Sequence, residues 1–304
     1  DPKTGKVEVV IKDLAMPNGI VFSPDETRLY VADTGGSARH PDPKFHNIAA
    51  GIHCYDITPD GKLGNQRFTI DKGSDGMAVD VTQAESVDAL AGRVFAEYGN
   101  VHLLFNNAGV GIKEAKRPIW TLPEKDWQWA YAVNVMGVTN GIRAFVPTML
   151  ERGEAGHVIN TSSGNGGIAS LPTTPVYASS KAAVTSLTEV LHFQFLLEGA
   201  KLQAHVLFPG PHLVNTNILS SDRVRPEAFR VPGQAPATYV DMQALAKSAG
   251  VALQLTEPEE VADMALDGIR EGRFWILSKL GKSDERLKAR TKSILDRANP
   301  EPTK

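Results

Sequence analysis

The sequence contains a single cysteine, Cys54, among its 304 residues. One thiol cannot close a disulfide within the chain, and Cys54 has no partner at a metal-ligand spacing. Apolar runs approaching the roughly 18 residues of a membrane span are also lacking, and the first ten residues do not have the basic-then-apolar order of a signal peptide. These absences favour a reduced, cytoplasmic setting without a membrane partner.

A strong charge of either sign is lacking as well. The 32 Lys and Arg residues nearly balance the 35 Asp and Glu residues, which gives a net charge of −3. The basic residues are scattered rather than clustered, so the sequence does not indicate a nucleic-acid surface. Hydrophobic residues make up 42% of the chain, enough for a sizeable core. The expected partner is a small molecule.

The pattern of the chain changes near residue 80. Before it, short β-like runs such as "RLYVAD" and "HCYDI" are separated by the turn sequences "SPD" and "PDG". After it, apolar residues recur at helical spacing from Val87 to Tyr98, behind a Thr-x-x-Glu capping box that begins at Thr82. We therefore predict an all-β segment over residues 1–79 and a second domain over residues 80–304.

The second domain alternates apolar strands with helices. Helices are predicted to begin near residues 121, 177 and 258, and strands are predicted at "HLLFNNAG" (102–109), "HVINTSS" (157–163), "QAHVLFPG" (203–210) and "RFWIL" (273–277). Such alternation makes βαβ units, so we expect an α/β, Rossmann-like fold with a mostly parallel sheet and flanking helices. Folds of this class bind ligands in the loops at the carboxyl ends of their strands.

Two polar side chains of this domain lie at a spacing that suits chemistry. Tyr177 and Lys181 are four residues apart, which places a phenol and an ammonium on one helix face. A Tyr-x-x-x-Lys pair also occurs by chance, and its ordinary interpretation is a solvated helix surface. The strand that ends in hydroxyl side chains at Ser163, a short way upstream, gives the pair a functional setting.

Five motifs then follow one another in the order typical of a known enzyme family. They are "NNAG" at 106–109, "NVMG" at 134–137, "NTSS" at 160–163, "YASSK" at 177–181 and "PG" at 209–210. Residues 80–304 therefore resemble the short-chain dehydrogenases/reductases. The resemblance implies an oxidoreductase that interconverts a secondary alcohol and a ketone with NAD or NADP. It also implies a homo-oligomer formed through the two long helices, and a catalytic tetrad of Asn134, Ser163, Tyr177 and Lys181.

The same resemblance implies the residues that bind the cofactor. Asp80 would contact the adenine, the segment from Asn106 through Ala108 to Gly109 would support the adenosine side, and Thr216 would hold the nicotinamide amide. Tyr177, Lys181, Pro209 and Gly210 complete the implied set. NAD and NADP remain open alternatives, because the residue that discriminates them normally follows a strand that this sequence lacks.

The residue types suit hydride chemistry. A phenol has an ordinary pKa near 10 and is a poor base at neutral pH, so we expect the Lys181 charge to lower the pKa of Tyr177. Ser163 would hold the substrate oxygen, and Asn134 would anchor a water or backbone group that orients Lys181. The histidines, among them His157 and His205, have no ligand spacing and are expected to pack or to face solvent.

The sequence lacks the strand, Gly-rich turn and helix that normally receive the cofactor pyrophosphate. "TGGSARH" at 34–40 has no third glycine at the needed spacing, and "SGNGG" at 163–167 occupies the serine loop. Strands 1 to 3 of the usual fold are thus missing. We expect the strand at 102–109 to have an uncovered edge and the cofactor to bind weakly.

Residues 1–80 instead resemble part of the gluconolactonase and senescence-marker-protein propellers. "MPNGIVFSPDETRLYVADT" and "SDGMAVD" carry this resemblance, and the junction falls within "AVDV" at 78–81. The resemblance implies Asn18 and Asp75 as ligands of a divalent cation, whereas ordinary turn chemistry explains the same Asn-Gly and Asp-Gly pairs. The alternative functions are therefore a metal-dependent, gluconolactonase-like hydrolase and an inactive chimera.

Overall fold

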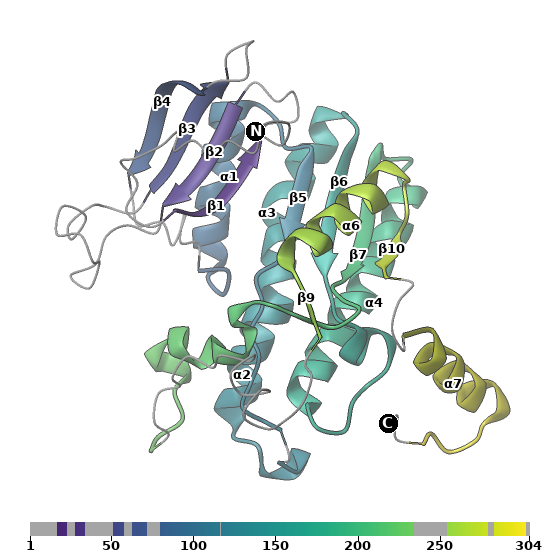
Figure 1. The fold of residues 1–304 in the computed structure, drawn as a ribbon. Coiled ribbons are helices and arrows are strands. Elements are labelled where there is room, and N and C mark those ends of the chain that lie inside the picture. The colour runs from purple at the N-terminus through teal and green to yellow at the C-terminus, as the bar shows by residue number, and fades with distance from the viewer. Residues whose placement is uncertain are drawn as a thin grey trace, which may run out of the picture. The chain divides into compact units, whose positions relative to one another are not determined.

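A computed structural model describes residues 17–22, 28–33, 51–57, 63–71, 80–115, 117–233, 254–278 and 283–301. The chain divides into two compact units, Asp1–Asp80 and Val81–Lys304. Figure 1 labels the helices and strands of both units.

The N-terminal unit contains one antiparallel sheet. Its four strands follow the order of the chain: β1 (Pro17–Phe22), β2 (Arg28–Asp33), β3 (Gly51–Ile57) and β4 (Leu63–Asp71). Each strand pairs with the next, with Val31 opposite His53 in the ladder between β2 and β3. A meander of four strands is the size of one propeller blade. The predicted all-β character of this segment is confirmed.

The C-terminal unit is built on a parallel sheet. Its strands are β5 (Leu103–Asn106), β6 (Gly156–Thr161), β7 (Leu202–Phe208) and β10 (Trp275–Leu277), in the order β10-β7-β6-β5. All three ladders are parallel. The apolar runs of β6 and β7 are buried on both faces, as strands between two layers of helices must be. The expected Rossmann-like α/β fold is confirmed.

The described helices of this unit are α1 (Ala84–Tyr98), α2 (Glu124–Tyr131), α3 (Gly137–Arg152), α4 (Pro175–Leu197), α6 (Pro258–Arg270) and α7 (Ser283–Asp296). Helix α6 lies across one face of the sheet, and α3 and α4 lie behind it (Figure 1). A single turn of π-helix, Ala132–Met136, joins α2 to α3. The connections contain three short 3-10 segments, Ile119–Thr121, Asn217–Val224 and Glu227–Phe229. They also contain two short strands that pair in parallel, β8 (Leu213–Val214) and β9 (Leu255–Thr256).

Alternation along the strands sorts their side chains between the two helical layers. Ile159 and Leu207 pack with Ile276 against Ala265 and Ile269 of α6, which lies across one face of the sheet (Figure 1). Fully burying an Ile or Leu side chain contributes about 1.5–3 kcal/mol. The neighbouring Asn160 points to the other face, because its amide donates to the Thr188 hydroxyl of α4 at 3.0 Å.

The start of α1 corrects one sequence prediction. Gln83 is the N-cap residue, and its side chain makes no capping hydrogen bond. The predicted capping box at Thr82 is therefore wrong, because the first helical residue is Ala84 and Thr82 lies one position too early to serve as the cap. Glu85 still lies in the first turn, where its charge favours the helix dipole.

Strand β5 forms one edge of the parallel sheet. Among the described residues no strand pairs with its outer side. Leu103 and Phe105 remain 40% and 42% exposed, whereas Leu104 between them is 9% exposed. An apolar edge strand of this kind tends to associate with other chains unless something covers it.

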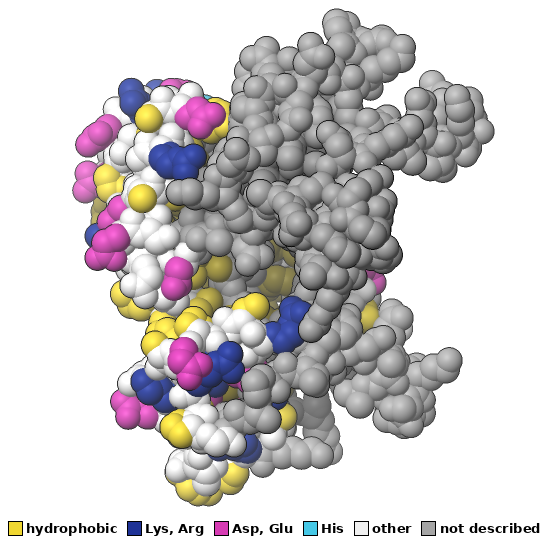
Figure 2. Space-filling model, turned by 90° about the vertical axis from the view of Figure 1, so that its left-hand side faces the viewer, with side chains coloured by type: hydrophobic (Ala, Val, Ile, Leu, Met, Phe, Trp, Pro, Cys, Tyr) yellow, Lys and Arg dark blue, Asp and Glu magenta, His cyan; other side chains and the backbone are white. Residues whose placement is uncertain are grey.

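The described surface carries mixed charges. On the face that Figure 2 shows, the coloured Lys and Arg side chains are interspersed with Asp and Glu, and no large patch carries charge of one sign. Within the same described residues, no helix is long and apolar enough to span a bilayer.

Candidate active site

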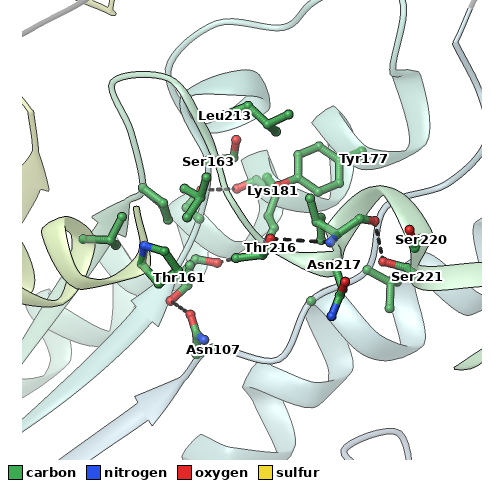
Figure 3. Close-up of a pocket in the computed structure, with 18 of the residues that line it drawn as sticks. Asn107, Thr161, Ser163, Tyr177, Lys181, Leu213, Thr216, Asn217, Ser220 and Ser221 are labelled. Carbon is green, nitrogen blue, oxygen red and sulfur yellow. Dashed lines mark hydrogen bonds between the residues drawn. The ribbon is translucent and has the colours of Figure 1, made fainter. Parts of the chain in front are cut away.

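A cavity of about 570 Å³ lies at the carboxyl ends of β5, β6 and β7. The loops after these strands, α4 and the segment after β8 supply its walls. Ser163, Tyr177 and Lys181 converge at one side of it, and Asn107, Thr161 and Thr216 lie around them (Figure 3). The position matches the rule that open α/β sheets bind ligands beyond the carboxyl ends of their strands.

Lys181 is a buried cation at the floor of this cavity. Its side chain projects from α4 and is 3% exposed. The ammonium Nζ donates to the carbonyl oxygen of Thr161, the last residue of β6, at 2.8 Å. Burial lowers the pKa of Lys181 to about 8, because removal from water disfavours the charged form. The ammonium therefore titrates close to physiological pH.

Tyr177 lies one helical turn before Lys181, and Nζ is 5.9 Å from the centre of the phenol ring. Burial raises the pKa of Tyr177, and a hydrogen bond with the Ser163 side chain opposes part of that rise. The predicted lowering of this pKa by Lys181 is therefore wrong for the protein by itself. Removing the phenolate from water costs more than the contacts within the chain return.

Asn134 is fully buried in the π-helical turn. Its Oδ1 accepts from the Val110 amide at 2.8 Å, and its Nδ2 donates to the Val110 carbonyl at 3.1 Å and to the Ser180 hydroxyl at 3.0 Å. Ser180 in turn donates to the Tyr177 carbonyl at 2.7 Å. Asn134 thus joins the loop after β5 to Ser180 of the Tyr177 helix, and its expected part in orienting Lys181 stays a prediction.

The "NNAG" segment divides between core and cavity. Asn106 points into the protein, where its amide donates to Asn160 at 2.8 Å, and Ala108 does not line the cavity. Asn107 and Gly109 do line it. A Cβ on Gly109 would lie 3.4 Å from the Lys181 ammonium, so glycine allows this close approach.

The other predicted cofactor residues are distributed as follows. Pro209 and Thr216 line the cavity, and the Thr216 hydroxyl caps the segment Asn217–Val224 by accepting from the Ile218 amide at 3.4 Å. Gly210 lines a neighbouring cavity instead. Asp80 closes the N-terminal unit, so its contact with an adenine remains a prediction.

Sequence reasoning missed Glu114, a fully buried carboxylate in the loop after β5. Its two oxygens accept from the backbone amides of Val176 and Tyr177 at 2.7 and 3.0 Å. The carboxylate therefore caps the N-terminus of α4, where a negative charge is also stabilised by the positive end of the helix dipole. Burial raises the pKa of Glu114, and the two amide hydrogen bonds lower it in part. A lone acid in a loop gives no sequence signal for this role.

A buried ion cluster, also missed, fixes the segment after β8. The Arg225 guanidinium lies 2.7 Å from the Asp126 carboxylate of α2 and 3.3 Å from Asp222. It also lies over the Trp129 ring, 4.9 Å from its centre. Ser221 accepts from the Gly111 amide at 3.1 Å. These contacts hold the stretch from Ser221 to Arg225 beside the cavity, and Ser221, Arg223 and Val224 are part of the cavity lining.

The proposed metal ligands fall largely outside the described residues. Asn18 lies in β1, of which the backbone alone is described, and Asp75 lies beyond the described ranges. Elsewhere in the described chain, no three His, Cys, Asp or Glu residues are grouped so as to hold a metal ion.

Comparison with known proteins agrees with this geometry. Residues 65–225, more than half of the 304, match the family model described as short chain dehydrogenase. The chain belongs to the short-chain dehydrogenase family. Residues 1–87 match a second model, the SMP-30/Gluconolactonase/LRE-like region. Both predicted resemblances are confirmed, and the two matches overlap around the boundary between the two units.

Individual family members cover most of the C-terminal unit. A CLA biosynthesis dehydrogenase/reductase from Lactiplantibacillus plantarum is 28% identical over 69% of this chain and 72% of its own length. The probable oxidoreductase EphD of Mycobacterium bovis is 33% identical over 64% of this chain, which covers only 30% of that protein. A short chain dehydrogenase/reductase from Burkholderia phymatum, solved in complex with NAD, superimposes with a TM-score of 0.65 at 36% identity, over 75% of this chain and 79% of its own.

The buried ammonium yields a prediction for stability. Burial lowers the Lys181 pKa from 10.5 to about 8. Below pH 8, Lys181 carries a desolvated charge in the folded state. Between pH 8 and 10.5, Lys181 is neutral in the folded state but still charged in the unfolded chain. The free energy of unfolding therefore rises with pH in this range. Lys181→Met should therefore stabilise the unit at pH 7 by about 2–3 kcal/mol, and this advantage should shrink towards pH 10.

Urea unfolding followed by tryptophan fluorescence tests this prediction. All four tryptophans, Trp120, Trp127, Trp129 and Trp275, lie in the C-terminal unit, so the signal reports that unit. Exposed Lys288 provides the control, because Lys288→Met should change stability little at either pH. An advantage of Lys181→Met that is equal at pH 7 and pH 10 would contradict the assigned cause.

Proposed function

We propose that this chain is an NAD(P)-dependent oxidoreductase that interconverts a secondary alcohol and a ketone. The observation that carries the proposal is the convergence of Ser163, Tyr177 and Lys181 on one cavity beside the carboxyl ends of the parallel strands. Membership of the short-chain dehydrogenase family supports the same reaction class.

The residues would divide the reaction as follows. Ser163 holds the substrate oxygen, and Tyr177 takes the hydroxyl proton during oxidation or returns it during reduction. Lys181, when protonated, would stabilise the phenolate and would hold the ribose of a bound cofactor by a hydrogen bond. Asn134 keeps the backbone of the Tyr177 helix in place through Ser180. A bound oxidised nicotinamide supplies the hydride acceptor, so that alcohol and oxidised cofactor become ketone, reduced cofactor and a proton.

The described residues fit one end of such a cofactor. Around Lys181 they line a cavity in which Gly109, having no side chain, leaves room beside the ammonium. Asn107 and Thr216 form part of the same cavity wall. The described residues of the C-terminal unit contain no strand, Gly-rich turn and helix ahead of α1 to receive a pyrophosphate. We therefore assign Tyr177 and Lys181 to the ribose and Thr216 to the nicotinamide amide, and we assign no phosphate cradle.

Removal of the phenol hydroxyl tests the reaction. Tyr177→Phe should lower kcat/KM for a secondary alcohol such as 1-phenylethanol by the 10² to 10⁴ typical of a lost general acid/base. Initial rates of NADH or NADPH formation at saturating cofactor provide the measurement. Tyr131→Phe is the matched control, because that hydroxyl lies outside the cavity lining. Turnover that survives in Tyr177→Phe would refute the proposed role.

Cofactor affinity should be weak. Hydrogen bonds to a charged group contribute about 1.5–3 kcal/mol each, so the loss of two or three raises the dissociation constant by about 10² or more. We expect a chimera in which a family-type strand, Gly-rich turn, helix, strand and helix replace residues 1–79 to recover this factor. Titration of NADH and NADPH fluorescence compares the two proteins. Equal micromolar affinity in both would show that the original chain provides a phosphate site elsewhere.

The surface of α4 favours a homo-oligomer. Val190, Phe193 and Leu197 lie along one stripe of the helix and are 51%, 57% and 86% exposed. We expect light scattering to give a dimer or larger assembly for the wild type and a smaller species for Phe193→Glu. Leu287→Glu places the same charge on exposed α7 and should leave the mass unchanged. A monomeric wild type would contradict the proposal.

A further inference from the structure

A second cavity, of about 360 Å³, shares Ser163 and Tyr177 with the first. Apolar side chains form most of its walls, among them Ile112, Phe208 and Leu219. The first turn of α7 closes one side of it with Ser283 and Arg286. Because Ser163 and Tyr177 line both cavities, this one suits the substrate when the cofactor occupies the other.

Arg286, in the wall of this cavity, has one buried donor without an acceptor. Its Nε is buried and has no hydrogen-bond partner. Within the described residues no carboxylate forms an ion pair with it. A buried donor left unsatisfied costs about 1–3 kcal/mol, so this Nε calls for a partner that the described part of the chain does not supply.

The carboxylate that shares this cavity, Glu114, is already committed. Both of its oxygens accept backbone amides at the start of α4. Within the described residues no ion pair joins Glu114 to Arg286, so the Arg286 Nε keeps its donor for a ligand.

The position of Arg286 is fixed by its neighbour one turn later. Arg290 donates from Nη1 to the carbonyl of Ile168 at 2.9 Å, which ties α7 to the turn that follows Ser163. The Ser283 hydroxyl comes within 3.8 Å of the point where a Cβ on Gly164 would lie. Helix α7, which carries Arg286, is thus held against the loop that contains Ser163.

We propose that Arg286 binds a carboxylate of the substrate, so that the preferred substrates are small hydroxy or oxo carboxylic acids. The proposal rests on the redox function proposed above. The carbinol or carbonyl group would meet Ser163 and Tyr177, the apolar walls would enclose the carbon body, and the acid would reach the guanidinium. A planar guanidinium matches a carboxylate with two parallel hydrogen bonds. The cavity volume lies near the lower end of the range for small-molecule sites, about 300–1,000 Å³, which favours compact acids.

A binding experiment tests the assignment without turnover. The probes are 3-phenylpropanoate and its neutral isostere 3-phenylpropanamide, titrated calorimetrically into the full chain at pH 7.5. The acid should bind Arg286→Gln about 10- to 100-fold more weakly than it binds the wild type, the factor of one charge-assisted hydrogen bond. The amide should bind both proteins alike. Arg286→Lys keeps the positive charge but loses the planar group that donates two parallel hydrogen bonds, so its affinity for the acid should lie between those of Arg286→Gln and the wild type.

Lys288→Gln is the matched control. It removes the same charge from the same helix at an exposed position outside the cavity lining, and it should leave binding of the acid unchanged. Equal affinity for acid and amide in the wild type, or an unchanged affinity for the acid in Arg286→Gln, would overturn the proposal.

Turnover then separates this proposal from the redox function. We expect kcat/KM for 3-hydroxy-3-phenylpropanoate to exceed that for its methyl ester, and Arg286→Gln to abolish the difference. Selective binding of the acid without oxidation of any alcohol would leave Arg286 as the carboxylate site and refute the redox function. Oxidation of alcohols with no preference for the acid in binding or turnover would refute the role of Arg286 and leave the redox function intact.

Discussion

The burial of one positive charge, the Lys181 ammonium, is the constraint around which the C-terminal unit is organised. A desolvated ammonium destabilises the fold unless fixed dipoles surround it. The Thr161 carbonyl at the end of β6 supplies one such dipole, and Gly109 leaves room at the end of β5. The carbonyl of Lys181 itself accepts from the Ser162 hydroxyl at 2.8 Å. Both strand ends must therefore lie in register with one turn of α4, which the parallel ladder between β5 and β6 provides.

The N-terminus of α4 adds a second constraint of opposite sign. Glu114 brings a buried negative charge to the amides of Val176 and Tyr177. The helix that carries the phenol is thereby fixed at its start by the loop after β5 and further along by Asn134 and Ser180. Catalytic geometry of this kind depends on supporting contacts to within fractions of an ångström. Two polar groups, Glu114 and Asn134, thus fix the position of the helix that carries the Tyr177 hydroxyl.

The sequence alone predicted the elements that are buried along their whole length. It did not predict the elements and side chains whose place depends on one or two contacts. Strands β6 and β7 are long apolar runs, and five ordered motifs located Ser163, Tyr177 and Lys181. Helix α7 has no buried residue and hence no apolar period, so neither the helix nor Arg286 was predicted. Glu114 acts from an irregular loop. Asn106 illustrates a further limit, because a motif names the residue but not the side to which its amide turns.

The division of the chain separates reaction chemistry from cofactor affinity. Every residue that we propose for proton transfer lies between residues 134 and 181. The ladder of β5, β6 and β7, together with helices α3 and α4, positions these residues. A dinucleotide, however, extends well beyond its reacting ring, and in a doubly wound fold its phosphates are received by elements on the far side of the strand that is here the edge, β5. Binding energy from such remote parts is what normally holds the reacting ring in place. The parallel sheet, which in the described residues has β5 as its edge, therefore keeps the groups that we propose for proton transfer, and we expect it to lack contacts that would hold a hydride acceptor beside them.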